Sequence, residues 1–193
     1  MAHPHVFVDV GLTFHTDAAG AVNGVEVTWR YDSLFSLLVL SDRGLDMDGD
    51  MALTEAERAA LLGFDLMDWE DGFDGALFLR RNEVDVPLGP PQALSLELRD
   101  GHLVTRHLRP LATPVAPTGL IVRPYDPSYY AALSLSDHVK APAGCDVRVI
   151  PPDRKAADAQ VEALGGFGDE ATFEEALVGG YYADTLVLSC AQF

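Results

Sequence analysis

Acidic residues between Asp46 and Glu57 have the spacing of a twelve-residue EF-hand calcium loop. Three aspartates hold positions 1, 3 and 5, and a glutamate holds position 12, where a bidentate carboxylate closes such a site. Position 7 offers a backbone carbonyl, and Ca²⁺ is a hard cation that takes about six to eight oxygen ligands. The pattern predicts a calcium site with these ligands: Asp46, Asp48, Asp50, Ala52, Thr54 and Glu57.

One position departs from this pattern, because Met51 stands at position 6, where glycine normally allows a sharp turn. A side chain held at positive φ costs about 1–2 kcal/mol, so we expect weaker binding than in an ideal loop. The alternative is an acidic surface turn followed by a capping box, Thr54 to Glu57, that begins a helix. The two interpretations are compatible, since the second helix of an EF-hand begins in that region.

A second group of metal-ligating residue types lies near the N-terminus. His3 and His5 are two residues apart and would share one face of a strand, with Asp9 further along that face. Two imidazoles, together with a free amine at His3, suit Zn²⁺, or Cu²⁺ or Ni²⁺, with Cu²⁺ favoured on intrinsic affinity. The alternative is that histidines at a chain end are solvated and mobile.

The composition is that of a folded and strongly acidic protein. Of 193 residues 48% are hydrophobic, which excludes a disordered chain and allows a proper core. The formal net charge of −17 argues against nucleic acid as a partner and suits a protein that meets cations. No apolar run approaches the ~18 residues of a membrane-spanning helix, so we expect no membrane insertion.

The two cysteines, Cys145 and Cys190, are either buried thiols or one disulfide, depending on the compartment. Ala2 before a polar stretch is typical of the residue that precedes a signal-peptidase cut. We therefore expect an exported protein whose natural leader is replaced by Met1 and whose mature chain begins at His3. In an oxidising compartment the cysteines are expected to pair, which would stabilise the fold by roughly 4 kcal/mol.

Short strands and a few helices must position these groups. Alternating apolar residues predict an antiparallel hairpin of strands at 3–15 and 22–31, and the pair Asp100-Gly101 predicts another hairpin turn. Asp32-Ser33 is typical of a helix N-terminus. We predict helices at 34–41, 54–62, 153–164 and 170–177, and further strands at 76–80, 83–87, 92–98, 103–111, 120–123, 131–136, 146–150 and 185–190.

Together these elements predict an α+β fold, mainly antiparallel and sandwich-like, with an inserted helix-loop-helix unit of EF-hand type at about residues 33–63. A single such unit must pack its apolar faces elsewhere, here against the sheet. Gly89-Pro90-Pro91 suggests a boundary between an N-terminal α+β half, 1–90, and a C-terminal sandwich-like half, 91–193. One continuous domain is the alternative.

The sequence contains no nucleophile elbow, phosphate loop or zinc-hydrolase motif, so we do not predict an enzyme. His102 and His107 are five residues apart, fall on opposite strand faces and are predicted to be ordinary surface residues.

Several stretches, spread over nearly the whole chain, resemble one family. They are His-Pro-His-Val-Phe-Val-Asp at 3–9, Val-Thr-Trp-Arg-Tyr-Asp at 27–32 with the apolar helix after it, the calcium-type loop, Pro-Leu-Ala at 110–112, Tyr-Asp-Pro-Ser-Tyr-Tyr at 125–130 and the late cysteine pair. Together they resemble the DUF1007 family of exported bacterial proteins.

This resemblance implies a periplasmic component of a transport system, and some such proteins accompany nickel/cobalt-type permeases and contribute to zinc acquisition. The family's His-Pro-His start matches His3 and His5, although this chain, with six histidines, lacks the His-rich tract of zinc-binding members. We therefore expect a periplasmic accessory protein that binds a transition metal, above all zinc, for a membrane permease and is stabilised by calcium. The alternative is a calcium-stabilised structural or interaction module without a transition-metal role.

Overall fold

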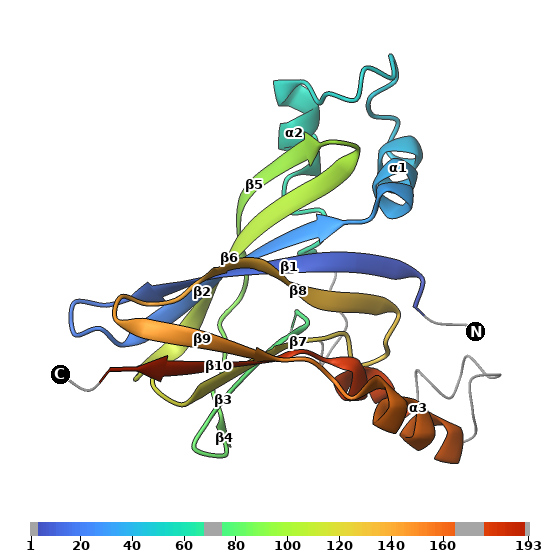
Figure 1. The fold of residues 1–193 in the computed structure, drawn as a ribbon. Helices are drawn as coiled ribbons and strands as arrows, with labels where there is room; N and C mark the ends of the chain where they lie inside the picture. Colours follow the sequence, from blue (N-terminus) through green and yellow to red (C-terminus); the bar gives the residue numbers. More distant parts are fainter. Residues whose placement is uncertain (1–3, 68–74, 165–175, 192–193) are drawn as a thin grey trace.

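A computed structural model describes residues 4–67, 75–164 and 176–191 and shows a mixed α+β fold (Figure 1). The described strands form two five-stranded sheets with the orders β5-β6-β2-β1-β8 and β4-β3-β7-β10-β9. Neighbouring strands are antiparallel except for β1 and β8, which are parallel. The predicted fold class, α+β with mainly antiparallel strands, is confirmed.

The first sheet is built around β1, which lies between β2 and β8. Its inward side chains are apolar and alternate with outward ones, from Val6 through Val10 to Phe14, as a half-buried strand requires. The predicted hairpins that pair β1 with β2 and β5 with β6 are both present. The strands of this sheet are β1 (Val6–Thr16), β2 (Val22–Tyr31), β5 (Gln92–Arg99), β6 (His102–Val115) and β8 (Ala131–Lys140).

The second sheet is antiparallel throughout its described strands. Its two C-terminal strands are tied by the disulfide between Cys145 and Cys190, which face each other in the β9–β10 register, so the expected pairing is confirmed. The strands of this sheet are β3 (Leu77–Arg81), β4 (Val84–Asp85), β7 (Leu120–Pro124), β9 (Cys145–Ile150) and β10 (Thr185–Cys190).

The main core lies between the two sheets. One cluster of buried side chains includes Val10 and Leu12 from the first sheet and Leu120, Leu186 and Leu188 from the second. The apolar faces of the two sheets thus bury each other from water, and this burial is the main source of stability in a two-layer fold. The predicted boundary near residue 90 lies between β4 and β5, and each sheet contains strands from both sides of it.

Two helices, α1 (Ser33–Asp42) and α2 (Glu55–Leu61), are inserted between β2 and β3. The predicted helix starts are confirmed, because the Asp32 carboxylate accepts the Phe35 N–H and Thr54 forms a full capping box with Glu57. Figure 1 shows this insertion at one end of the molecule, where α1 lies against β6 and α2 against β5. The insertion therefore packs against the β5–β6 hairpin.

At the C-terminal side, α3 (Arg154–Ala163) confirms the helix predicted at 153–164. A 3-10 helix, η1 (Val178–Tyr182), packs on it, and the sequence pattern did not predict this element. The helix predicted at 170–177 lies mostly outside the described residues. Within the described part of the chain, no helix is long and apolar enough to cross a membrane.

Candidate functional site

The chain leaves α1 through a tight C-terminal turn that leads into the acidic loop. Gly44 has φ 63°, its N–H donates to the Ser41 carbonyl, and the Leu45 N–H donates to the Leu40 carbonyl. This is the hydrogen-bond pattern of a glycine-ended helix, in which the left-handed residue satisfies the last carbonyls. The helix therefore stops before Asp46, and the loop begins as a separate segment.

The loop backbone is tightly coiled. Asp46, Gly49 and Met51 all have positive φ, at 51°, 68° and 60°. The positive φ expected at Met51 is thus present, and its side chain extends to the turn between β5 and β6. A Cβ at Gly101 would lie 3.3 Å from the Met51 terminal methyl group, so this methionine connects the loop to the hairpin.

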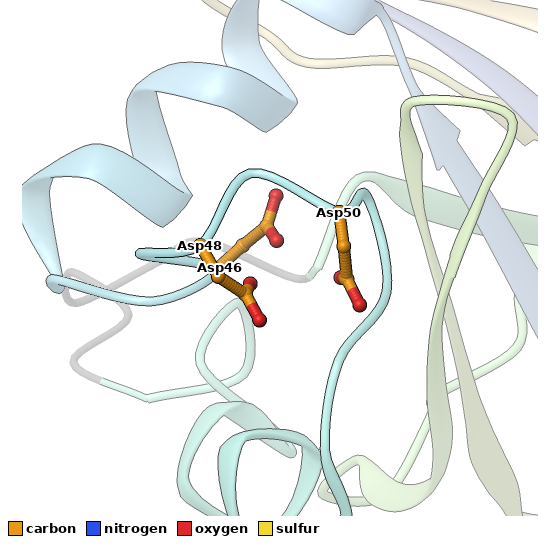
Figure 2. A group of neighbouring side chains, drawn as sticks. All are labelled: Asp46, Asp48 and Asp50. Carbon is orange, nitrogen blue, oxygen red and sulfur yellow. The ribbon is translucent and has the colours of Figure 1, made fainter.

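Three carboxylates converge in this loop (Figure 2). Ligand oxygens of Asp46, Asp48 and Asp50 all lie within 4.8 Å of one another. A depression of about 380 Å³ beside them is lined by loop positions 3, 5, 7, 8, 9 and 12, together with Met47. The residues at these positions are Asp48, Asp50, Ala52, Leu53, Thr54 and Glu57.

Glu57 closes the loop by joining its last residue to its first. One carboxylate oxygen accepts the Asp46 N–H at 2.9 Å, and the other accepts the Thr54 N–H at 2.8 Å and the Thr54 hydroxyl at 2.7 Å. The Thr54 hydroxyl and the two backbone donors hold the pKa of Glu57 below its ordinary value. The carboxylate is therefore ionised at neutral pH and fixed beside the aspartates.

The donor set fits a hard divalent cation. Oδ1 of Asp46 is shielded from solvent and has no hydrogen-bond partner among the described residues, which is costly for a carboxylate oxygen unless a cation meets it. Desolvation raises the pKa of Asp46, and repulsion from Asp50 and Asp48 adds to this, while a backbone hydrogen bond from Met51 opposes it. A bound cation would relieve both the desolvation and the repulsion.

Apolar side chains fix the loop and its helices to the main core. Leu40 of α1, Leu53 at loop position 8 and Leu61 of α2 are all buried in the cluster that holds the two sheets. Ser36 is fully buried, and its hydroxyl donates to the Asp32 carbonyl at 2.7 Å and accepts the Leu103 N–H at 2.8 Å. The loop is thus held at both ends by packed elements.

Of the predicted transition-metal residues, the two that the structure describes, His5 and Asp9, belong to no comparable cluster within the described part of the chain. His3 lies outside the described residues. His5, which directly precedes β1, and Asp9, on the outward side of β1, are both exposed. The His5 ring contacts the Tyr130 ring at 5.0 Å between centroids, and Asp9 pairs with Arg30 at 3.3 Å. Across residues 4–67, 75–164 and 176–191, the aspartates of the loop are the one group of three or more metal-ligating side chains close enough to share an ion.

The prediction that His107 is a surface residue is wrong. It is fully buried, its ring contacts Trp29 edge-on at 4.7 Å, and neither ring nitrogen has a hydrogen-bond partner among the described residues. Burial, with repulsion from Arg109, lowers its pKa to about 4. The inward face of β6 also carries Thr105 and Arg109, so hydrophobicity alone could not identify it.

Asp65 is a partly buried group that sequence reasoning also missed. Its carboxylate accepts the Tyr31 hydroxyl at 3.0 Å and the Thr105 hydroxyl at 2.6 Å. Burial raises its pKa, and the two hydroxyl groups oppose that shift. It links the segment after α2 to β2 and β6. Since Asp65 falls in an acidic stretch with no periodicity, no sequence signal marked it as partly buried.

A protein-family comparison identifies the chain. The model described as "Protein of unknown function (DUF1007)" matches residues 1–190. The chain belongs to the DUF1007 family. Because DUF1007 is described as a family of unknown function, membership gives no activity to this site. A comparison with curated proteins finds no match.

Solved structures similar to this DUF1007 chain are distant. The acetylcholine-binding protein from Bulinus truncatus has a TM-score of 0.32 at 10% identity, with 99% of this chain and 90% of that chain covered. Acetylcholine-binding protein type 1 of Biomphalaria glabrata has a TM-score of 0.30 at 13% identity, with 96% and 85% covered. Scores this low support no argument about the fold or a ligand.

Proposed function

We propose that this protein is an exported calcium-binding interaction module. In this proposal an ion at residues 46–57 holds the α1–α2 insertion in place on the β5–β6 hairpin. The insertion is then a unit of EF-hand type that packs on a sheet instead of on a second EF-hand. The disulfide supports an oxidising compartment, for which we propose the periplasm.

One observation carries the proposal. Carboxylate oxygens of three aspartates lie within 4.8 Å of one another, and a solvent-shielded oxygen of Asp46 has no hydrogen-bond partner among the described residues. Like charges at this distance repel, and hydrogen bonds within the loop do not neutralise them. An all-oxygen set with four carboxylates favours Ca²⁺ over Zn²⁺, which prefers nitrogen and sulfur ligands. Bound Ca²⁺ would supply the missing positive charge.

The test is thermal unfolding with Ca²⁺ and with a chelator. Calcium at about 100 times its Kd stabilises the native state by about 2.7 kcal/mol, which raises the Tm by roughly 5–10 °C for a chain of this size. Asp48→Asn should abolish most of that rise, because it removes one full ligand charge. The matched control is Asp137→Asn, which changes an exposed aspartate of β8.

The two variants separate ion binding from a general effect of charge. The control should keep the whole calcium-dependent rise in Tm. An equal rise in Asp48→Asn and in the unchanged protein, or no rise in either, would refute the calcium site. Mg²⁺ in place of Ca²⁺ should give a smaller rise, since Mg²⁺ demands a stricter octahedral geometry and gives up its water reluctantly.

The transition-metal role is a second proposal, made for His3, His5 and Asp9. It is supported by the exposure of His5 just before β1 and of Asp9 on that strand, and by the family resemblance to zinc-related accessory proteins of membrane permeases. Zn²⁺ titration of protein that begins at His3 tests it. Equal Zn²⁺ affinity in a His3→Ala, His5→Ala double variant would exclude this site, and a permease partner would lose its main support.

A further inference from the structure

The outer face of α1 is an exposed leucine surface. Leu34, Leu37 and Leu38 are 65%, 59% and 51% exposed, and their spacing places them on one side of the helix. We call these three residues the α1 stripe. The opposite side of α1 contains the buried Leu40 beside the fully buried Ser36, so apolar side chains lie on both sides of the helix. A helix of this kind is normally covered on both sides.

Further apolar groups lie at the two ends of the α1 stripe. Near the start of α1 is Phe7, 56% exposed, whose N–H donates to the Asp32 side chain and whose carbonyl accepts the Asp32 N–H. Beyond the other end the loop exposes Met47. Methionine side chains adapt readily to different partners, so this end suits a recognition surface.

The charge around the stripe selects what can cover it. From residue 33 to residue 61 the chain has six acidic and two basic residues, a net charge of −4, which becomes −2 when one Ca²⁺ is bound. Asp42 ends α1, where the helix dipole is also negative, and the three loop aspartates follow. Arg43, the one basic residue between positions 33 and 57, is placed over the Phe64 ring. The carboxyl end of the stripe is therefore acidic.

We propose that the α1 stripe binds a basic amphipathic helix of a partner protein, with leucine-like residues on the stripe and lysine or arginine over the acidic end. This inference rests on the proposed function, since it names the partner class of the interaction module. A second copy of the chain would bring the same acidic loops together, and each copy has a net charge of −17. An anionic membrane surface meets the same repulsion.

The probe is a fluorescein-labelled synthetic leucine–lysine amphipathic helix, followed by anisotropy at about 0.15 M salt, where long-range charge effects are screened. It should bind, and its leucine–glutamate counterpart should not. A Leu37→Ser, Leu38→Ser double variant should weaken binding at least about tenfold, a loss of about 1.4 kcal/mol. Leu164→Ser is the matched control, because Leu164 is also 51% exposed but caps α3 at another part of the molecule.

The proposal would be overturned if the double variant bound the leucine–lysine helix as tightly as the unchanged protein does, or if the leucine–glutamate helix bound equally well. Self-association of the protein through the α1 stripe would also overturn it, and so would stripe-dependent retention by phosphatidylglycerol vesicles. Leu37→Ala, Leu38→Ala repeats the test with residues that favour a helix, in case serine disturbs α1. The peptide is titrated with Ca²⁺ present and again in a chelator, and Ca²⁺ is titrated without peptide. A missing calcium site and a missing partner surface thus give separate results.

Discussion

Ser36 provides a sharp test of how α1 is held on the sheet. Ser36→Ala removes the hydroxyl that accepts the Leu103 N–H, and this buried donor on β6 then loses its partner. An unsatisfied buried donor costs about 1–3 kcal/mol. The Asp32 carbonyl also accepts the Ser36 N–H, so it stays satisfied, and alanine recovers about 0.5 kcal/mol through its helix propensity. We expect a net loss of about 1–2 kcal/mol.

The assay is urea unfolding with a fitted midpoint and slope, supported by thermal melts, in which the Tm should fall by about 3–6 °C. Ser41→Ala is the matched control, because Ser41 is an exposed serine of the same helix. It should leave stability unchanged or slightly higher. If both variants had the same stability, the Ser36–Leu103 hydrogen bond would not anchor α1. Ser36→Ala should also weaken peptide binding, because the α1 stripe depends on this anchor.

Three further predictions concern the disulfide, the buried histidine and the loop. Cys145→Ala, Cys190→Ala should lose about 4 kcal/mol in denaturant unfolding, given a separation of 45 residues, and a loss below about 1 kcal/mol would contradict the chain-entropy argument. The lowered pKa of His107, about 4 against an ordinary 6.5, means that the neutral ring favours folding above pH 6.5 and that this contribution is lost as pH falls towards 4. His107→Leu should therefore lessen the fall in the free energy of unfolding between these pH values, measured by urea unfolding, by up to about 1.4 kcal/mol per pH unit, and an unchanged pH profile would show that the ring is not the cause. Because Met51 has φ 60°, a conformation that costs a side chain about 1–2 kcal/mol, Met51→Gly should tighten the calcium Kd by about 5- to 30-fold in calorimetric titration, and an unchanged Kd would contradict the expectation that Met51 weakens the site.

Local patterns in the sequence were enough to predict much of the fold. The alternation from Val6 to Phe14 predicted β1, Asp100-Gly101 predicted the β5–β6 turn, and the Thr54–Glu57 pair predicted the start of α2. Each of these features is decided by residues close together in the chain. The 1-3-5 spacing of the loop likewise predicted that its aspartates would converge.

Features that depend on distant contacts could not be predicted in this way. Nothing local shows that β8 pairs with β1 in parallel, that His107 faces Trp29, or that Asp65 lies against Tyr31. The exposure of the leucines in α1 was also not predicted, because a largely apolar run of ten residues normally indicates a buried helix. Residues that depart from the local sequence pattern can therefore be identified only from the tertiary structure.

The parallel pairing of β1 with β8 also sets the order in which the sheet can close. Val6 pairs with Ala131 and Thr13 with Lys140, so β1 has no neighbour on that side until a segment about 125 residues further along the chain has folded back. Until then the edge of an apolar strand is open to other unfolded chains. The final β1–β8 closure also spans a long loop, which slows folding.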